Sequence, residues 1–278
     1  MISSVSYNNI NNVQRVNFKG VEAQQQKPVS TVSQPNLTSN SVLIDNACMG
    51  RDLVKTTDTK DLNIVFEKLK DKDGVDFVNT AYTELVKYMD LEGVAPNKIT
   101  WEKNEGRPIV GDYRFYNNSI VFYSDYFMKM DKASQLGIIA HELTHCKQLE
   151  NMLRTEGISV ERIAYAYAVS DMRAMMVNNP KIQQMHAQAK ANGKEQEFIQ
   201  QMVALGTMKT TKELNEAHAN TLKMPKHPLN SEKGKKAQTD LVAQFNYNGA
   251  DMVAYNKCPM EKEAMMFENK IKNAYLKG

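Results

Sequence analysis

Apolar residues three or four positions apart predict two amphipathic helices in the first third of the chain. The first begins near Asp61, with leucine, valine and phenylalanine on one face, and the second runs from Phe77 to Met89. Asp73-Gly74 separates them, and a glycine and a proline at positions 93 and 96 end the second. We expect this helix pair to pack on the back of the functional part of the molecule.

Between residues 98 and 123 apolar and polar residues alternate instead of recurring every three or four positions, which indicates β-structure. Lys98–Glu102 alternates, a second apolar stretch spans residues 108–116, and Ser119–Tyr123 is β-branched and aromatic. Asn117-Asn118 is a turn signal between the last two. The pattern predicts three short strands, the last two forming a hairpin. Ile120–Tyr123 is our candidate for a strand that holds an extended peptide as an added strand; a plain core strand is the alternative.

A strongly apolar run follows, from Leu136 to Leu149, with Asp131 ahead of it as a plausible N-cap. It is apolar nearly all round, so it predicts a helix inside the domain rather than on its surface. Polar residues enter the run mainly at positions 141, 142, 144 and 145. Burying such groups without partners costs about 1–3 kcal/mol each. The pattern therefore indicates a site that provides partners for them.

The second half of the chain has mainly helical periodicity. Residues 153–235 form a helical insertion that is broken at Asn178-Asn179-Pro180 and continues in short helices over 182–191, 195–204 and 211–222. A last pair covers 236–245 and a helix opened by Pro259. Residues 1–55 lack a sustained period and are rich in Ser, Asn and Gln, which predicts a disordered tail. The expected class is α+β, mainly helical, with one domain over 56–278.

Composition adds limits on location and partners. Of the 278 residues, 42% are hydrophobic, enough for a packed core, and the net charge of +3 is too small to indicate nucleic acid or an anionic membrane as partner. There is no apolar run near eighteen residues and no secretory signal, so a cytoplasmic location is the default expectation, with non-standard export as the alternative. Three distant cysteines argue against a disulfide scaffold. Cys48 is either a linker thiol or, if the chain has a metal site, a pro-segment ligand that silences it.

Candidate chemistry centres on His141-Glu142-Leu143-Thr144-His145, an H-E-x-x-H sequence. On a helix, histidines four positions apart leave the same face and can reach one Zn²⁺. Glu142 follows the first histidine directly and can reach a zinc-bound water without binding the metal. The alternative is a chance match, with both histidines hydrogen-bonded in an ordinary core.

A catalytic zinc site uses three protein ligands, so a third must come from a distant element. The helix opened by Pro259 carries two carboxylates, Glu261 and Glu263, and then turns apolar. These two point about 200° apart on a helix, so only one can bind the metal. Spacing alone does not choose between them or exclude carboxylates elsewhere.

With these two motifs the sequence resembles the gluzincin metallopeptidases. His141–His145 is similar to the family's first motif, and Pro259–Ala264 to the P-x-E-x-E-A form of its second. The resemblance covers about residues 98–152 and 250–278. The family's E-x-x-A spacing implies Glu261 as the third ligand, with Glu263 as the fallback. At the position where the family often has an aspartate that orients a ligand histidine, this chain has Met265. We expect Glu268, which lies on the same face of the helix as Glu261, to take over this role.

The resemblance implies a zincin-like fold and a peptidase that binds one Zn²⁺ per chain and cleaves a peptide or protein substrate. Glu142 then acts as the general base. Tyr255, Tyr247 and His227 are candidates for the donor to the oxyanion. Two other readings stay open: a catalytically silent zinc-binding interaction module, and an exported effector with the tail as its address. The sequence leaves the oligomeric state open.

Overall fold

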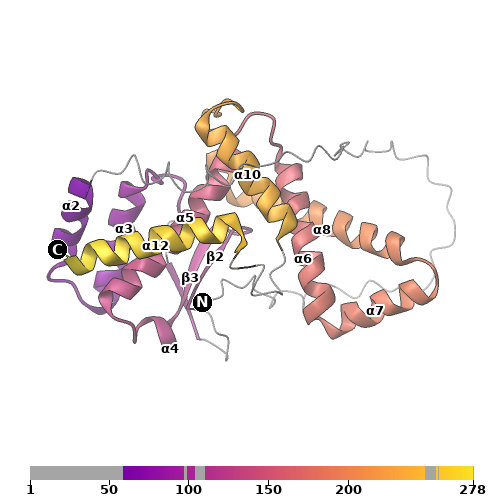
Figure 1. Ribbon diagram of the computed structural model, residues 1–278, viewed down its shortest axis with the longest axis horizontal. Coiled ribbons are helices and arrows are strands. Elements are labelled where there is room, and N and C mark those ends of the chain that lie inside the picture. The colour runs from indigo at the N-terminus through magenta and orange to yellow at the C-terminus, as the bar shows by residue number, and fades with distance from the viewer. Residues whose placement is uncertain (1–58, 97–98, 104–109, 248–254, 256, 278) are drawn as a thin grey trace.

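The computed structural model describes residues 59–96, 99–103, 110–247, 255 and 257–277 (Figure 1). It is mainly helical, with one small sheet, so the α+β class is confirmed. The tail predicted over residues 1–55 and Cys48 within it lie outside the described residues. Among the helices that are described, none combines the length and the apolar composition that a membrane span requires.

The sheet consists of β1 (Ile99–Glu102), β2 (Gly111–Arg114) and β3 (Ser119–Tyr123). β2 and β3 pair antiparallel, which confirms the predicted hairpin, whereas β1 pairs with β3 in parallel. The strand order is therefore β1-β3-β2. Both edges of β3 are occupied, so our expectation that Ile120–Tyr123 accepts a peptide as a further strand is wrong. Of the two edge strands in the described part of the chain, β2 is the one that contacts α5.

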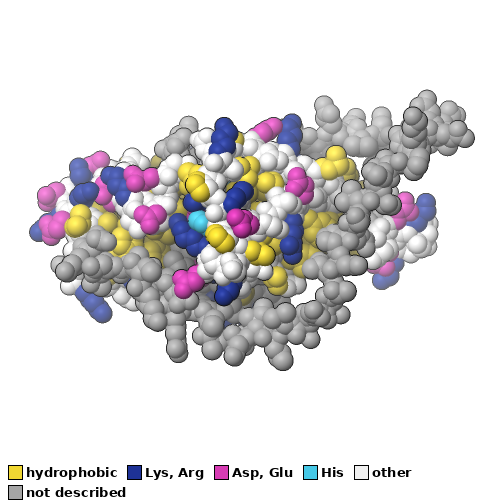
Figure 2. All heavy atoms as spheres, turned by 90° about the horizontal axis from the view of Figure 1, so that it is seen from above, with side chains coloured by type: hydrophobic (Ala, Val, Ile, Leu, Met, Phe, Trp, Pro, Cys, Tyr) yellow, Lys and Arg dark blue, Asp and Glu magenta, His cyan; other side chains and the backbone are white. Residues whose placement is uncertain are grey.

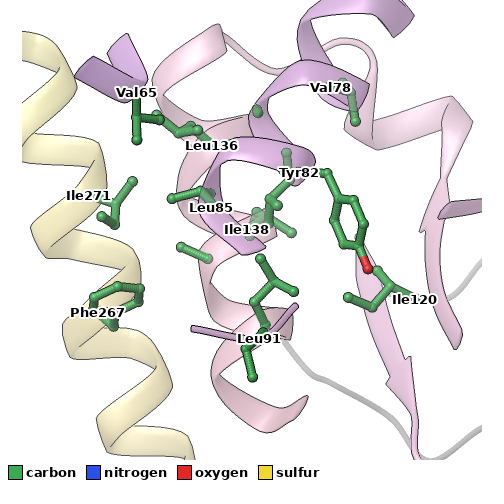
Figure 3. Close-up of a cluster of buried hydrophobic side chains, with 14 of the residues drawn as sticks. Val65, Val78, Tyr82, Leu85, Leu91, Ile120, Leu136, Ile138, Phe267 and Ile271 are labelled. Atoms are coloured by element: carbon green, nitrogen blue, oxygen red, sulfur yellow. The ribbon is translucent and has the colours of Figure 1, made fainter. Parts of the chain in front are cut away.

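Helix α5 (Lys132–Leu153) lies at the centre of the fold. Asp131 caps it as expected, because its carboxylate accepts a hydrogen bond from Ser134 N at 2.8 Å. Helices α3 (Gly74–Tyr88) and α12 (Pro259–Lys277) pack against it, α2 (Thr59–Leu69) packs on α3, and the short α4 (Ser124–Phe127) precedes α5. Figure 3 shows side chains of these elements and of β3 meeting in one hydrophobic core, among them Val65, Leu85, Ile120, Leu136, Phe267 and Ile271.

The helical insertion is built from α6 (Val160–Asn178), α7 (Pro180–Ala191), α8 (Glu195–Ala217) and α9 (Ala219–Lys223), and α10 (Glu232–Asn246) follows it. The predicted break between residues 204 and 211 is wrong, because α8 is continuous over 23 residues. Gly206 stands in that interval. A Cβ added there would lie 3.1 Å from Ala168 Cβ, so this glycine lets α8 approach α6 closely instead of ending a helix.

Two large hydrophobic clusters divide the molecule. The first joins α2, α3, the sheet, the first half of α5 and the later part of α12, and the second joins the end of α5 to α6, α8, α10 and the start of α12. Figure 1 shows α6, α7 and α8 on the side of the molecule away from α2 and α3. On the face in Figure 2, acidic and basic side chains are interspersed, in keeping with the small net charge.

Candidate metal centre

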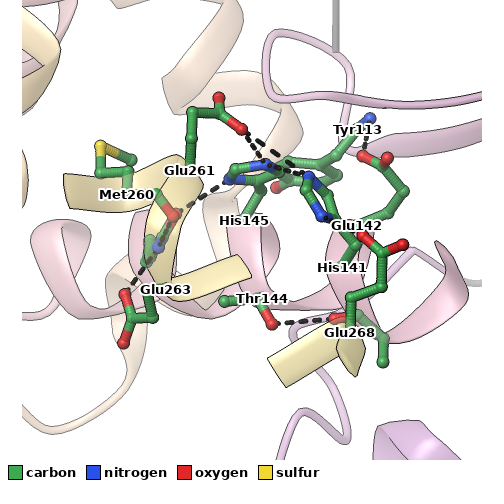
Figure 4. Close-up of polar contacts among 11 residues, drawn as sticks. Tyr113, His141, Glu142, Thr144, His145, Met260, Glu261, Glu263 and Glu268 are labelled. Carbon is green, nitrogen blue, oxygen red and sulfur yellow. Dashed lines mark hydrogen bonds and ion pairs between the residues drawn. The ribbon is translucent and has the colours of Figure 1, made fainter. Parts of the chain in front are cut away.

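The two motif histidines and Glu261 meet at one point between α5 and α12 (Figure 4). His141 Nε2 and His145 Nε2 are 3.2 Å apart. Glu261 Oε2 lies 3.4 Å from His145 Nε2 and 3.7 Å from His141 Nε2. His141 and Glu261 are buried, and His145 nearly so. The structure thus brings together the three residues expected to hold a metal, although the third stands in a different helix.

The fallback ligand, Glu263, points away from this triad. Its carboxylate pairs with Lys236 Nζ at 2.5 Å and accepts a hydrogen bond from Gln148 Nε2 at 2.7 Å. Glu261 and Glu263 are two positions apart on α12, so their side chains leave the helix on nearly opposite sides. The geometry therefore favours Glu261 over Glu263 as the third ligand.

Each histidine of the triad has an acceptor at its other ring nitrogen. His141 Nδ1 lies 3.0 Å from Glu268 Oε2, in the orienting position expected for Glu268. His145 Nδ1 lies 2.9 Å from Gln148 Oε1, a partner that the motifs did not indicate. Both Nδ1 atoms therefore donate a proton. In a neutral imidazole the second nitrogen then carries a lone pair. Both Nε2 lone pairs point to the same place.

Such a cluster could hold a metal cation. Two lone pairs 3.2 Å apart repel each other, and Glu261 Oε2 is a buried oxygen without a hydrogen-bond partner among the described residues. Protein ligands lie about 2.0–2.2 Å from Zn²⁺, so two ligands of a tetrahedral site are about 3.3–3.6 Å apart. The three observed separations, 3.2, 3.4 and 3.7 Å, are close to this range. Two imidazole nitrogens and a carboxylate oxygen are a donor set that suits Zn²⁺.

Charges within the triad shift its protonation equilibria. Burial alone would lower the pKa of His141, but the nearby carboxylates of Glu261 and Glu268 outweigh it and raise this pKa to about 10. Burial would raise the pKa of Glu261, yet the two histidines hold it well below its usual range. The carboxylate is therefore ionised at neutral pH. Protons and a metal ion compete for the same two ring nitrogens, so metal binding releases protons.

Glu142 lies beside the triad and against β2. Its Oε2 accepts a hydrogen bond from Tyr113 N at 2.8 Å, and burial raises the pKa of its carboxyl group. A Cβ on Gly111 would lie 3.1 Å from Glu142 Oε1, so glycine at this position lets the strand approach the carboxylate. The sequence contains one signal of this contact, since glycine within a strand often marks close approach of the backbone. We did not predict a role for Gly111 or Tyr113.

A second carboxyl group, on Asp112, faces the same region. Burial and the nearby Glu142 raise its pKa to about 7, and Arg114 works against this shift with an Nε 3.2 Å from the Asp112 carboxylate. The Arg114 guanidinium also forms two 2.7 Å bonds to the carboxylate of Glu102 on β1. These contacts fix the outer part of β2 next to Glu142.

A cleft opens beside the triad. One part of its wall is formed by His145 and Glu261, and another by β2 and the residues that follow it. Most of the other side chains in the wall are aromatic or contain sulfur. The remaining lining residues are Asp112, Tyr113, Arg114, Phe115, Tyr116, Tyr167, Gln244, Tyr247, Cys258 and Met260. A metal ion at the triad would therefore be reachable from this cleft.

The three candidates for the oxyanion donor lie in different places. Tyr247 lines the cleft. Tyr255 is buried, with its ring 6.4 Å from that of Tyr247, and is not part of the wall. His227 lies past the C-terminal end of α5, where its backbone N–H donates to Arg154 O at 2.6 Å. Of the three, Tyr247 is the one placed beside the triad.

Comparisons of the chain with protein-family models, with curated proteins and with solved structures find no match. The geometry of the site therefore carries the functional argument.

Proposed function

We propose that the protein is a zinc-dependent peptidase of gluzincin type, in which His141, His145 and Glu261 hold the metal. The observation that carries the proposal is the convergence of two imidazole lone pairs and an unpartnered carboxylate oxygen on one point. A buried carboxylate beside that point, on Glu142, supports a catalytic site rather than a purely structural one. The cleft along β2 supports access for a substrate.

Glu142 is the proton carrier in this proposal. Bound Zn²⁺ would supply a Lewis acid that activates water and polarises the scissile carbonyl group. Glu142 accepts the proton of the attacking water and transfers it to the leaving amine. The Tyr113 N–H holds Oε2, so Oε1 is the oxygen that takes the proton. The raised pKa of the Glu142 carboxyl group brings it nearer to neutral pH, where a general base works best.

The substrate in this proposal is an extended peptide that lies along β2. Its backbone can pair with the edge of β2 that β3 does not cover, apart from the Tyr113 N–H, which Glu142 holds. The aromatic side chains after β2 and on α6, Phe115 and Tyr167, are stacked with ring centroids 3.9 Å apart and form an apolar part of the cleft wall. We therefore expect a bulky apolar side chain next to the cleaved bond.

The test separates metal binding from catalysis. We expect Glu142→Gln to retain one zinc per chain and to lose cleavage of a proteome-derived peptide mixture by a factor of about 10²–10⁴, the usual contribution of a general base. His145→Ala is expected to lose both zinc and cleavage. Zinc content is measured by elemental analysis and cleavage by mass spectrometry.

If wild-type protein binds zinc but cuts no peptide, the site belongs to a silent zinc-binding module instead. If Glu142→Gln cuts as well as wild type, Glu142 is not the base.

A further inference from the structure

A chain of polar contacts leads from the metal centre to α10, a helix outside the region that resembles gluzincins. It begins at His145 Nδ1, which lies 2.9 Å from Gln148 Oε1 one turn further along α5. Gln148 Nε2 then donates to Glu263 Oε2 at 2.7 Å and to Met260 O at 3.0 Å, both near the start of α12. Gln148 is 2% exposed, so water does not compete strongly for these bonds.

The surroundings of Gln148 determine which way its amide points. A glutamine side chain can present either its oxygen or its NH₂ group to a neighbour. Glu263 and the Met260 carbonyl group are both acceptors, so the NH₂ group must face them. The amide oxygen is left to face His145. It accepts a hydrogen bond from the Nδ1–H of that histidine. This bond keeps the lone pair on Nε2, the nitrogen that points at the metal position.

Glu263 is held in place from the far side by α10. Lys236 Nζ lies 2.5 Å from Glu263 Oε2 and 2.5 Å from Asp240 Oδ1. Asp240 is fully buried, so the lysine provides the positive charge that both carboxylates need. The position of the Glu263 carboxylate therefore depends on α10, although α10 provides no metal ligand.

We propose that Gln148 is a positioning residue for His145, and that Glu263, held by Lys236, keeps the Gln148 amide in the orientation that accepts a hydrogen bond from His145 Nδ1–H. The inference rests on the metal site of the proposed function and assigns a role to Gln148 and Glu263 that neither motif implies. Partners of this kind, which orient a metal-binding histidine, change metal affinity about 10–100-fold when they are removed.

Gln148→Met is the first test, because methionine has a similar volume and its thioether is only a weak hydrogen-bond acceptor. We expect its zinc affinity, measured by competition with a chelator, to fall about 10–100-fold relative to wild type. Gln135→Met is the matched control. Gln135 is a buried glutamine on the same helix, and its Nε2 donates to Phe127 O at 3.0 Å, away from the triad. We expect this control to keep wild-type zinc affinity, even if it loses thermal stability.

Glu263→Gln is the second test and keeps the volume of the side chain. An amide at position 263 can donate as well as accept, so Gln148 becomes free to turn its NH₂ group toward His145. We expect a fall in zinc affinity, smaller than that of Gln148→Met, and a changed visible absorption spectrum of the Co²⁺-loaded protein. Circular dichroism confirms that each variant is folded.

The outcomes separate the inference from the proposed function. If wild-type protein binds no zinc, the metal site itself is wrong. If wild type binds zinc, His145→Ala does not, and Gln148→Met and Glu263→Gln both keep wild-type affinity and Co²⁺ spectrum, only the positioning role is overturned. Equal losses in Gln148→Met and Gln135→Met would also overturn it, because they would indicate a general packing effect.

Discussion

Four buried carboxylate oxygens lack a hydrogen-bond partner among the described residues, and for two of them, on Glu261 and Asp171, the surroundings shift the pKa in opposite directions. Glu261 Oε2 faces two histidines, which lower the pKa of its carboxyl group. Asp171 Oδ1, on α6, has no such partner. Burial raises the pKa of Asp171 to about 7, and the charge of Lys209 offsets only part of this shift. A buried carboxylate is thus kept ionised where cationic groups face it and is pushed toward its neutral form where they do not.

The raised pKa of Asp171 predicts a loss of stability as pH rises. The unfolded chain ionises this group near its ordinary value of 3.8, whereas the folded protein does so near 7. Between these values the folded state binds more protons, so the free energy of unfolding falls as pH increases and reaches its lower level above about pH 7. We expect Asp171→Asn to raise the free energy of unfolding by on the order of 1 kcal/mol at pH 8, a gain that shrinks toward pH 4.

Urea unfolding at pH 5 and pH 8 measures this difference. Asp76→Asn is the control, because the Asp76 side chain is exposed on α3. A gain for Asp171→Asn that is equal at both pH values would contradict the prediction, since it would come from packing and not from a buried charge.

At single positions, the sequence was informative where a spacing rule connects residues to a metal. The four-residue spacing of His141 and His145 and the family-like E-x-x-A spacing at Glu261 both led to residues that the structure brings together. No comparable rule indicates Gln148 or Tyr113. Gln148 is uncharged and acts through its amide orientation, and Tyr113 contributes a backbone N–H, which every residue except proline has.

Among the elements, the crossing of α5 and α12 positions the site. The two helices meet at Gly137, where an added Cβ would lie 3.1 Å from Glu268 Cγ and 3.3 Å from the Glu268 backbone oxygen. Glu268 is also the residue that accepts the His141 Nδ1 proton. The absence of a side chain at position 137 therefore sets how closely α12 approaches and where the Glu268 carboxylate lies.

Gly137→Ala is predicted to weaken metal binding. The added methyl group must push α12 outward by a few tenths of an ångström, which moves Glu268 relative to His141. The better helix propensity of alanine, about 0.5–1 kcal/mol, offsets part of the strain, so we expect a small change in stability but a several-fold loss of zinc affinity. Chelator competition gives the affinity.

Gly206→Ala is a close control for this prediction, since its added Cβ would be 3.1 Å from Ala168 Cβ in the α6–α8 contact. It introduces the same crowding between two helices away from the triad. Unchanged zinc affinity is expected there. If both alanine variants lose affinity to the same extent, the crossing at Gly137 has no special role.

Helices and the hairpin could be predicted because their signals are local: apolar residues recur with the period of the element, and Asn117-Asn118 marks a turn. The order of strands could not, because pairing of β1 with β3 is a contact between distant segments and leaves no periodic signal. The continuity of α8 was not predicted for a related reason. Glycine lowers the local helix propensity at position 206, but the small size of Gly206 allows α8 to pack closely against α6.

Across the whole molecule, the candidate metal centre lies where the two hydrophobic clusters meet. Along α5 the first cluster ends at Cys146 and the second begins at Leu149, while α12 contributes Met260 to the second cluster and Phe267 to the first. The triad lies at this boundary, and the Gln148–Met260 hydrogen bond beside it joins positions 112 apart in the sequence. A bound metal would therefore tie together the two helices that connect the clusters.

This arrangement predicts that metal binding stabilises the entire fold. A ligand present at about 1,000 times its dissociation constant adds about 4 kcal/mol to the free energy of unfolding, which corresponds to a rise in Tm of about 10 °C for a body of this size. We expect EDTA to lower the Tm of wild-type protein by roughly that amount and excess Zn²⁺ to restore it.

Two probes should report the same shift in Tm. One is the helical circular dichroism signal, and the other is the fluorescence of Trp101, which packs against Phe122 and Phe127 in the first cluster. His145→Ala should show the lower Tm with or without EDTA. A shift seen by circular dichroism but not by Trp101 would mean that the metal stabilises only the helices of the second cluster, and the two clusters would then unfold separately.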